Sequence, residues 1–369
     1  METIEFKLAE LFCGPGGLAL GAKSAVVSAK DKKYIVKPVW ANDIDKDACR
    51  TYSRNIHPDN AEAVVCAPIE EIDFEKVTGF DALAFGFPCN DFSIVGEQKG
   101  FKGKYGPLYT YGIKAINAHN PKWFIAENVS GLQTADNGLA FQRILEDLEK
   151  SGKGYELTAH LFKFEDYGIP QFRHRIVIVG IRKDLNLKFK VPSPNAAKYI
   201  SAKSALEDPP IGRDAPNNEM TKQSAVVVER LKYIPPGGNA WHEGIPENLR
   251  LKVKNARLSQ IYKRLHPERP AYTITGSGGG GTHVYHWDEN RALTNRERAR
   301  LQTFPDDFIF EGSKESVRKQ IGMAVPPLGV KTIIEAVLKT LAGIPFNSVP
   351  AKILNGNALV QRKLPFNSQ

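Results

Sequence analysis

The first half of the chain alternates short apolar runs with stretches whose apolar residues recur at helical spacing. Residues 122–126 are typical of a buried strand, and LAFQRILEDLEK at residues 139–150 is typical of an amphipathic helix. Strands that alternate with helices predict an α/β fold: a doubly wound, mostly parallel sheet with helices on both faces. The expected strands are residues 6–12, 35–41, 81–87, 122–126 and 176–181.

The pattern changes near residue 186. Residues 186–285 are rich in Pro, Asn and Lys, have weak periodicity, and end in TITGSGGGGTH, whose glycines suit a hinge. We expect a smaller, irregular domain there. Residues 286–345 become helical again and are expected to complete the large domain begun by residues 1–185, and residues 346–369 are expected to form a C-terminal tail.

Positive charge is concentrated in the irregular part. The net charge is +9, and residues 181–269 hold 17 Lys and Arg against 9 Asp and Glu. Scattered, solvated lysines would spread the excess evenly, so the segment favours a polyanionic partner. No stretch approaches the roughly 18 consecutive apolar residues of a membrane helix, and METIEFKLAE lacks a secretory pattern. We therefore expect no membrane contact and a cytoplasmic location.

The cysteines are Cys13, Cys49, Cys66 and Cys89. They form no CxxC pair, and no Cys/His cluster has zinc spacing, so no metal site is expected. Disulfides are not expected in a cytoplasmic protein.

A glycine-rich turn follows the first expected strand. FCGPGG at residues 12–17 permits close approach of the backbone to a ligand at the N-terminus of the next helix. The second strand ends at Asp43, whose carboxylate can accept ribose hydroxyls. A plain strand-to-helix turn is the alternative, but together the two features favour a cofactor that carries a nucleoside.

Reactive side chains follow the later strands. In GFPCNDFS (residues 86–93), Cys89 is either a nucleophile or a buried structural cysteine. Glu127 ends the apolar run WFIA, where burial is expected to raise its pKa and let it donate a proton. QFRHR at residues 171–175 precedes the fifth strand, and its two arginines are suited to an anion.

Six short sequence motifs follow one another along the chain in this order: LFCGPGG, GFPCNDFS, ENV, QFRHR, RPAYTITG and QIGMAVPP. Over about residues 8–340 the chain resembles the DNA cytosine-5 methyltransferases of bacterial restriction-modification systems. The resemblance implies S-adenosyl-L-methionine as the cofactor, double-stranded DNA as the substrate, a separate cognate restriction endonuclease and a monomeric enzyme. Residues 186–285 then correspond to the target-recognition domain.

The resemblance also implies the roles of the reactive residues. Cys89 adds to carbon 6 of cytosine, which makes carbon 5 nucleophilic. Glu127 supplies the proton at ring nitrogen 3, Arg175 holds the exocyclic oxygen, and Arg173 supports the same pocket. Both faces of the ring must be reached, so the cytosine must leave the duplex stack.

The cofactor and DNA contacts are carried over residue by residue. The cofactor-binding residues are expected to be Phe12, Gly14, Gly16, Gly17, Asp43, Ile44, Ile69, Pro88, Ala324 and Val325. The DNA-binding residues are expected to be Asn90, Ser93, Lys99, Lys102, Gly278 and Gly279. Residues 94–110 resemble the loop that closes over DNA.

Within the basic segment, further candidates rest on residue type alone. The candidate phosphate contacts are Lys252, Lys254, Arg257, Lys263 and Arg264. The aromatic residues that either contact bases or pack in a core are Tyr199, Tyr233, Trp241 and Tyr262.

Several positions depart from the family pattern. Met323 stands where Asn is usual, and Pro68 stands where an Asp commonly binds the adenine amino group. Asp43-Ile44 replaces Glu followed by a bulky aromatic residue, and Asn90 replaces the commoner Gln. Two alternatives remain at this point: an RNA methyltransferase of the same family, and a nucleic-acid-binding protein without catalytic activity.

Overall fold

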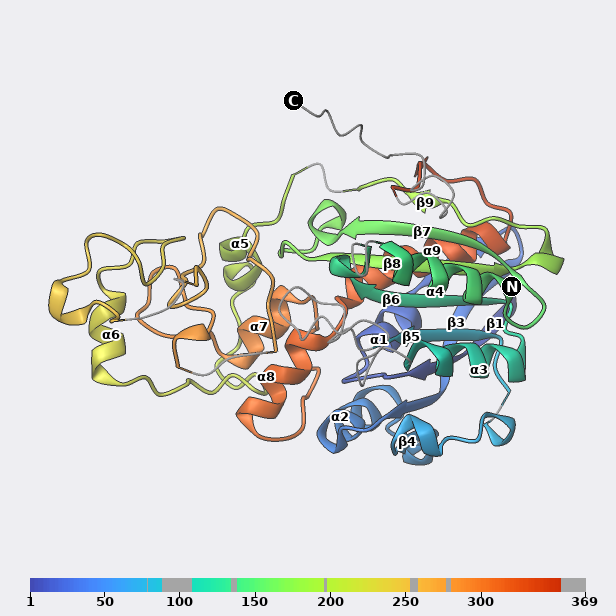
Figure 1. The fold of residues 1–369 in the computed structure, drawn as a ribbon, viewed down its shortest axis with the longest axis horizontal. Helices are drawn as coiled ribbons and strands as arrows, with labels where there is room; N and C mark the ends of the chain where they lie inside the picture. The colour runs from blue at the N-terminus through green and yellow to red at the C-terminus, as the bar shows by residue number, and fades with distance from the viewer. Residues whose placement is uncertain are drawn as a thin grey trace, which may run out of the picture.

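A central sheet organises the larger part of the molecule (Figure 1). The computed structural model describes residues 1–77, 79–87, 108–133, 138–195, 198–252, 258–276 and 280–352. Within these residues the sheet has eight strands, seven of them in the order β2-β3-β1-β5-β6-β8-β7, with β4 paired to β3. Their bounds are β1 (Glu2–Leu11), β2 (Val26–Ala29), β3 (Lys32–Asp43), β4 (Val64–Cys66), β5 (Ala82–Gly86), β6 (Trp123–Val129), β7 (Tyr155–Lys163) and β8 (His174–Arg182).

The mostly parallel α/β sheet predicted from the sequence is confirmed. β1, β3, β4, β5 and β6 pair in parallel, whereas β8 runs antiparallel to β6 with Glu127 opposite Val177. Because β8 is antiparallel, it begins at the edge where the parallel strands end. QFRHR therefore reaches the same edge as Asp43 and Glu127.

All five expected strands are present, and β2, β4 and β7 were not predicted. β7 has the sequence YELTAHLFK, in which polar residues interrupt the apolar ones. Thr158 and His160 are nevertheless buried, and the Thr158 hydroxyl donates to the Phe189 carbonyl at 2.9 Å. Only tertiary contacts give these polar side chains partners, so the apolar pattern alone does not indicate the strand.

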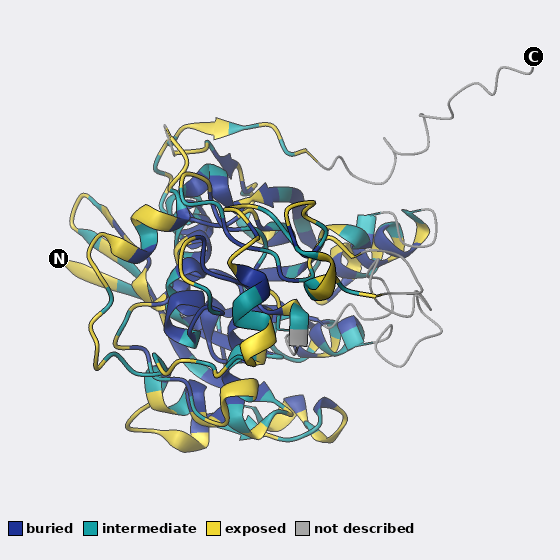
Figure 2. Cartoon of the chain, turned by 90° about the vertical axis from the view of Figure 1, so that its left-hand side faces the viewer, coloured by how far each residue is buried: buried dark blue, intermediate teal, exposed yellow. Residues whose placement is uncertain are grey.

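Helices cover both faces of the sheet, and their apolar faces form the two largest buried clusters (Figure 2). On one face, Val330 and Ile334 of the last helix pack with Phe6 and Leu8 of β1. On the other face, Ile116 and Phe141 pack among strand residues such as Phe85. The helices beside the sheet are α1 (Gly17–Ser24), α2 (Lys46–Ile56), α3 (Tyr109–His119), α4 (Leu139–Lys150) and α9 (Pro327–Leu341).

The stretch Lys314–Leu341 has the length and composition of a membrane span, but its most apolar window is 72% buried within the protein. It forms two helices, α8 (Lys314–Met323) and α9, separated by residues 324–326. α9 packs on α1 and β2. Burial of this degree is typical of helices in a protein core.

The chain from about residue 186 to residue 294 is mostly irregular and lies to one side of the sheet (Figure 1). Leu231, Tyr262 and Tyr285 lie in its small apolar cluster. The remaining elements are β9 (Val191–Pro192), α5 (Ala202–Glu207), α6 (Ala225–Leu231), α7 (Asn295–Leu301) and β10 (Ser348–Val349).

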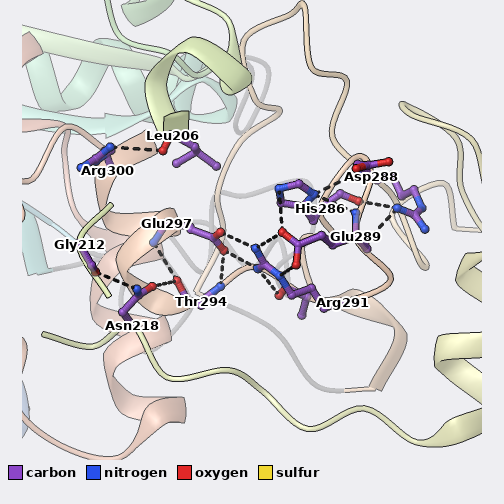
Figure 3. Close-up of polar contacts among 12 residues, drawn as sticks. Leu206, Gly212, Asn218, His286, Asp288, Glu289, Arg291, Thr294, Glu297 and Arg300 are labelled. Atoms are coloured by element: carbon purple, nitrogen blue, oxygen red, sulfur yellow. Dashed lines mark hydrogen bonds and ion pairs between the residues drawn. The ribbon is translucent and has the colours of Figure 1, made fainter. Parts of the chain in front are cut away.

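An ion-pair network joins this irregular region to the start of α7 (Figure 3). Arg291 lies between Glu289 and Glu297, with Nε–Oε2 of Glu289 at 2.8 Å and Nη2–Oε1 of Glu297 at 2.7 Å. The Thr294 hydroxyl accepts from the Glu297 amide, and the Glu297 carboxylate accepts from the Thr294 amide, which forms a capping box. The network therefore fixes the direction in which the chain enters α7.

Candidate active site

The glycine-rich turn joins β1 to α1 in a conformation that few residues adopt. Phe12, Gly14 and Gly16 have φ angles of 54°, 52° and 97°. A Cβ added to Gly14 would meet nothing within 4 Å, so open space lies beside the turn. A Cβ added to Gly17 would lie 2.4 Å from the Val325 carbonyl oxygen. The turn therefore needs glycine for two reasons, a left-handed backbone and close packing against residues 324–325.

Asp43 ends β3 beside this turn. Its Oδ2 accepts from the Gly14 amide at 2.8 Å, and its Oδ1 accepts from the Asp45 amide at 2.9 Å. Burial raises the pKa of the Asp43 carboxyl, although these backbone hydrogen bonds oppose the shift. Ile44 is 69% exposed and is free to pack on a ligand.

The segment after β4 is tied to the end of β3. The Ala67 amide donates to the Asp43 carbonyl at 3.1 Å, and Asn42 Nδ2 donates to the carbonyls of Val65 and Ala67. Pro68 therefore follows directly beside Asp43. The Ile69 side chain is 5% exposed and packs in the core, so its surface is largely committed to the fold and not to the cofactor.

Residues 324 and 325, from the C-terminal part of the chain, lie beside the glycine-rich turn. Ala324 and Val325 are buried, with Val325 against Gly17. Met323 is 66% exposed, so the thioether that replaces the usual Asn projects from the surface. Lys319 of α8 pairs with Asp45 at 2.9 Å, which ties α8 to the residues that follow β3.

Glu127 and Arg175 form a shielded ion pair where β6 ends. Their side chains are 12% and 15% exposed, and Arg175 Nε lies 2.9 Å from Glu127 Oε1. Arg175 precedes Val177 by two residues, so it projects from the same face as Glu127. Burial raises the pKa of the Glu127 carboxyl even though Arg175 and Arg173 lower it.

β5, which directly precedes the cysteine segment in the sequence, ends next to this pair. A Cβ added to Gly86, the last residue of β5, would lie 3.2 Å from Glu127 Oε2. Asn128 Nδ2 donates to the Phe87 carbonyl at 3.1 Å, which fixes the residue before Pro88. The expected site residues outside the described residues are Pro88, Cys89, Asn90, Ser93, Lys99, Lys102, Gly278 and Gly279.

Arg173 is buried behind the Glu127–Arg175 pair and is not open to solvent. It is 1% exposed, and its guanidinium donates to the carbonyls of Ile274, Gly322 and Ala324 at 3.1, 3.1 and 2.7 Å. These hydrogen bonds occupy both Nη groups, so Arg173 cannot contact a base in this arrangement. This geometry gives Arg173 a positioning role, because it holds residues 322–324 near the turn; the supporting role at the pocket expected from the sequence stays a prediction.

Comparisons with known proteins identify the family and the fold of this chain. A model of C-5 cytosine-specific DNA methylases matches residues 6–339. The chain is 59% identical over 357 residues to the Type II methyltransferase M.BbvI of Brevibacillus brevis, covering 95% of each chain. It is 42% identical to M.NgoFVII of Neisseria gonorrhoeae, covering 90% of this chain and 86% of that one.

This chain belongs to the C-5 cytosine-specific DNA methylases. It is a DNA cytosine-5 methyltransferase of the kind found in type II restriction-modification systems. Two solved structures share the fold. A prophage-encoded E. coli protein described as a DNA modification methyltransferase has a TM-score of 0.64 at 22% identity, over 91% of this chain and 99% of that one. Entamoeba histolytica EhMeth has a TM-score of 0.59 at 15% identity, over 92% and 98%.

The methylase has buried polar residues around its site to which the sequence analysis gave no role. Gln171 is fully buried: its Oε1 accepts from the Ile274 amide, and its Nε2 donates to Gln302 Oε1, both at 2.9 Å. Glu10 lies beneath the turn, where burial raises the pKa of its carboxyl to about 8, and Tyr52 donates to it at 3.1 Å. Gln171 is the first residue of QFRHR, and Glu10 directly precedes LFCGPGG. Their places in or beside these motifs are the feature of the sequence that could have indicated a role at the site.

The candidate DNA contacts of the methylase include both buried and exposed side chains. Arg264 is 3% exposed and donates to the carbonyls of Leu231, His286 and Glu289, so its prediction as a phosphate contact is wrong. Tyr262 is 7% exposed and packs in a core. Tyr199 and Tyr233 are 51% and 39% exposed, so they stay candidates. Lys252 is exposed and Lys263 half-buried, and Lys254 and Arg257 lie outside the described residues.

Proposed function

We propose that this enzyme methylates carbon 5 of a cytosine flipped out of duplex DNA, by way of a covalent adduct with Cys89. The observation that carries the proposal is the shielded Glu127–Arg175 pair at the strand edge that also bears the glycine turn and Asp43. One partner is an acid with a raised pKa, and the other is a fixed cation.

The cofactor of the proposal is S-adenosyl-L-methionine. The residues present fit it: Gly14 faces open space, Asp43 offers carboxylate lone pairs beside the turn, and Ile44 presents an exposed apolar surface. When bound, the sulfonium supplies an electrophilic methyl group. Pro68 offers no side-chain hydrogen bond to an adenine, so the backbone of residues 67–69 would have to provide that contact.

The proton and charge steps are assigned to this chain's own residues. The Cys89 thiolate bonds to carbon 6 of the ring, and negative charge develops towards nitrogen 3 and the exocyclic oxygen. Glu127 supplies a proton at nitrogen 3, and Arg175 stabilises the oxygen. Once carbon 5 carries the methyl group, its hydrogen leaves as a proton, the Cys89 sulfur departs as a thiolate, and the proton on nitrogen 3 returns to Glu127, which restores the neutral aromatic ring.

A trapped adduct tests this proposal directly. In duplex DNA with 5-fluorocytosine at the target, carbon 5 has no hydrogen that can leave as a proton, so the Cys89–carbon 6 bond should persist. We expect a denaturation-resistant protein–DNA complex from the wild-type protein and none from Cys89→Ser. A Cys89→Ser protein that still transferred methyl groups would overturn the mechanism.

The biological setting is a second part of the proposal. The enzyme is proposed to act as a monomer on bacterial chromosomal DNA in the cytoplasm and to protect it from a cognate restriction endonuclease on a separate chain. Expression in a host without cytosine-5 methylation, followed by base-resolution mapping, should show every copy of one short motif modified. An unmodified genome in cells containing folded enzyme would contradict the proposal.

A further inference from the structure

Buried arginines are numerous in the described part of the chain after residue 200, and most have clear partners. Arg296 donates to the carbonyls of Pro216, Pro305 and Phe308 at 2.9, 2.8 and 2.5 Å. Arg291 pairs with two carboxylates. These contacts satisfy the donors and, for Arg291, neutralise the charge, so a structural role explains them.

Arg298 and Arg318 differ from this pattern. Arg298 is 1% exposed, and among the described residues its hydrogen-bond partner is His283, whose Nδ1 lies a long 3.4 Å from Nη2. Within the same part of the chain, Arg298 Nη1 and Arg318 Nε have no hydrogen-bond partner. Arg318 Nη2 lies 3.8 Å from Glu315, whose side chain is 85% exposed, so this ion pair is weak.

The two guanidiniums act on each other and on His283. Burial, together with Arg318, lowers the pKa of Arg298 to about 10. Burial and both arginines lower the pKa of His283 to about 4, so at neutral pH this ring is uncharged and can accept from Arg298. The nearby carboxylate of Glu297 is already paired with Arg291. At neutral pH the cluster therefore holds two cations with little compensation.

The position of the cluster indicates what could compensate it. Arg298 lies on α7, Arg318 on α8, and His283 directly after the glycine-rich segment. α8 packs against the start of that segment, since a Cβ on Gly322 would lie 1.9 Å from the Gly276 amide nitrogen. The cluster thus lies near Gly276 and His283, the described residues on either side of the segment expected to meet DNA. A buried charged donor without a partner is costly, and an anionic ligand would offset that cost.

We propose that Arg318 and Arg298 form an anion subsite that receives one phosphodiester group of the bound DNA. Arg318, whose side chain is 11% exposed, makes the contact, and Arg298 behind it adds unscreened positive charge. The subsite rests on the proposed function only in that DNA is the ligand; it requires no methyl transfer.

The experiment compares Arg318→Met and Arg298→Met with the charge-matched control Lys150→Met on the exposed side of α4. Binding to a duplex is measured by fluorescence anisotropy over a range of salt concentrations. For Arg318→Met we expect the slope of log affinity against log salt to become shallower by about one, the contribution of one phosphate contact. For Arg298→Met we expect weaker binding than wild type, and Lys150→Met should match wild type.

Thermal unfolding without DNA separates this subsite from a structural role. Removal of an uncompensated charge should leave the unfolding temperature of Arg298→Met equal to or above that of wild type. A lower unfolding temperature together with an unchanged salt slope for Arg318→Met would overturn the proposal. If Arg298→Met fails to fold, the salt slope of DNA binding can still be measured with Arg318→Gln, because the Arg318 side chain is partly exposed.

Two further outcomes identify the source of the anion. In the first outcome, inorganic phosphate raises the unfolding temperature of the wild-type protein but not that of Arg318→Met, while the salt slope of DNA binding is the same for both proteins. That result would identify a site for free anions and would overturn the assignment to DNA. If the slope changes as expected but the wild-type protein never methylates DNA, the subsite stands and the proposed function fails.

Discussion

At the scale of single residues, the site depends on a carboxyl whose pKa is under opposing influences. Burial of Glu127 favours the neutral acid, whereas Arg175 at 2.9 Å favours the carboxylate, and the net shift is upward. A raised pKa keeps the acid protonated to a higher pH than an ordinary glutamate, and the rate should fall as pH rises through that pKa.

Glu127→Gln tests the proton role. The amide keeps the size of the side chain but cannot transfer a proton, so kcat should fall by about 10²–10⁴-fold. Duplex binding, measured by anisotropy, should change little, and the exposed Glu146→Gln on α4 is the matched control. A Glu127→Gln enzyme with wild-type kcat would contradict the assignment.

Glu10 gives a residue-scale prediction about stability. Burial raises the pKa of its carboxyl from 4.5 to about 8, so the folded state binds the proton more tightly than the unfolded state. The stabilisation is complete below pH 4.5 and is lost as pH rises to about 8. Urea unfolding at a series of pH values should therefore show wild type losing free energy of unfolding relative to Glu10→Gln between these limits; parallel curves would contradict the prediction.

At the scale of elements, the turn between β1 and α1 is shaped by a neighbour distant in sequence. Gly17 begins α1, and the Val325 carbonyl before α9 leaves no space for a side chain. Gly21 is similar, since a Cβ there would lie 2.4 Å from the Pro327 carbonyl oxygen. The close contact of α1 with α9 thus holds the turn and residues 324–325 together.

Gly17→Ala should therefore destabilise the protein by about 1–3 kcal/mol, the usual range for overpacking. Because the turn must shift, binding of S-adenosylhomocysteine, measured by calorimetry, should weaken as well. Gly79→Ala is the control, since its Cβ would meet nothing within 4 Å and its φ is not positive. Equal unfolding free energies for the two variants would refute the packing argument.

At the scale of the whole molecule, buried polar side chains join the catalytic edge to the C-terminal helices. Arg173 reaches Ile274, Gly322 and Ala324, and Gln171 connects through Gln302 to the Ile321 carbonyl. Since Arg173 stands two residues before Arg175, a displacement of α8 or of the segment around Ile274 would reach the Glu127–Arg175 pair. The network therefore couples the halves of the site.

Arg173→Lys tests this coupling. An ammonium has no planar fork and cannot reach three carbonyls in this geometry, so buried acceptors stay unpaired at a cost of about 1–3 kcal/mol. We expect a lower unfolding temperature, a reduced kcat, and a smaller change in KM for DNA. A loss of stability with unchanged kcat would show that Arg173 is structural alone.

Sequence patterns were sufficient for the strands whose residues are mostly apolar, whereas the roles of the residues at their ends stay predictions. The run that ends at Glu127 is apolar from Trp123 to Ala126, and the run that ends at Asp43 is interrupted only by Lys37 between Ile35 and Ala41, so both residues were placed at the ligand-facing edge. β7 and the antiparallel direction of β8 could not be predicted, because polar residues in β7 find partners only after folding, and strand direction depends on pairing.

For this protein, local sequence determined the glycine turn, the acid after WFIA, the order of the six motifs and the basic character of the irregular region. The tertiary structure decided that Arg175 meets Glu127, that Arg173 and Arg264 are held by carbonyls, and that Arg298 Nη1 and Arg318 Nε have no hydrogen-bond partner among the described residues. The physical reason is that residue type sets what a side chain can do, whereas burial and the partners brought together by distant segments decide which of those interactions it makes.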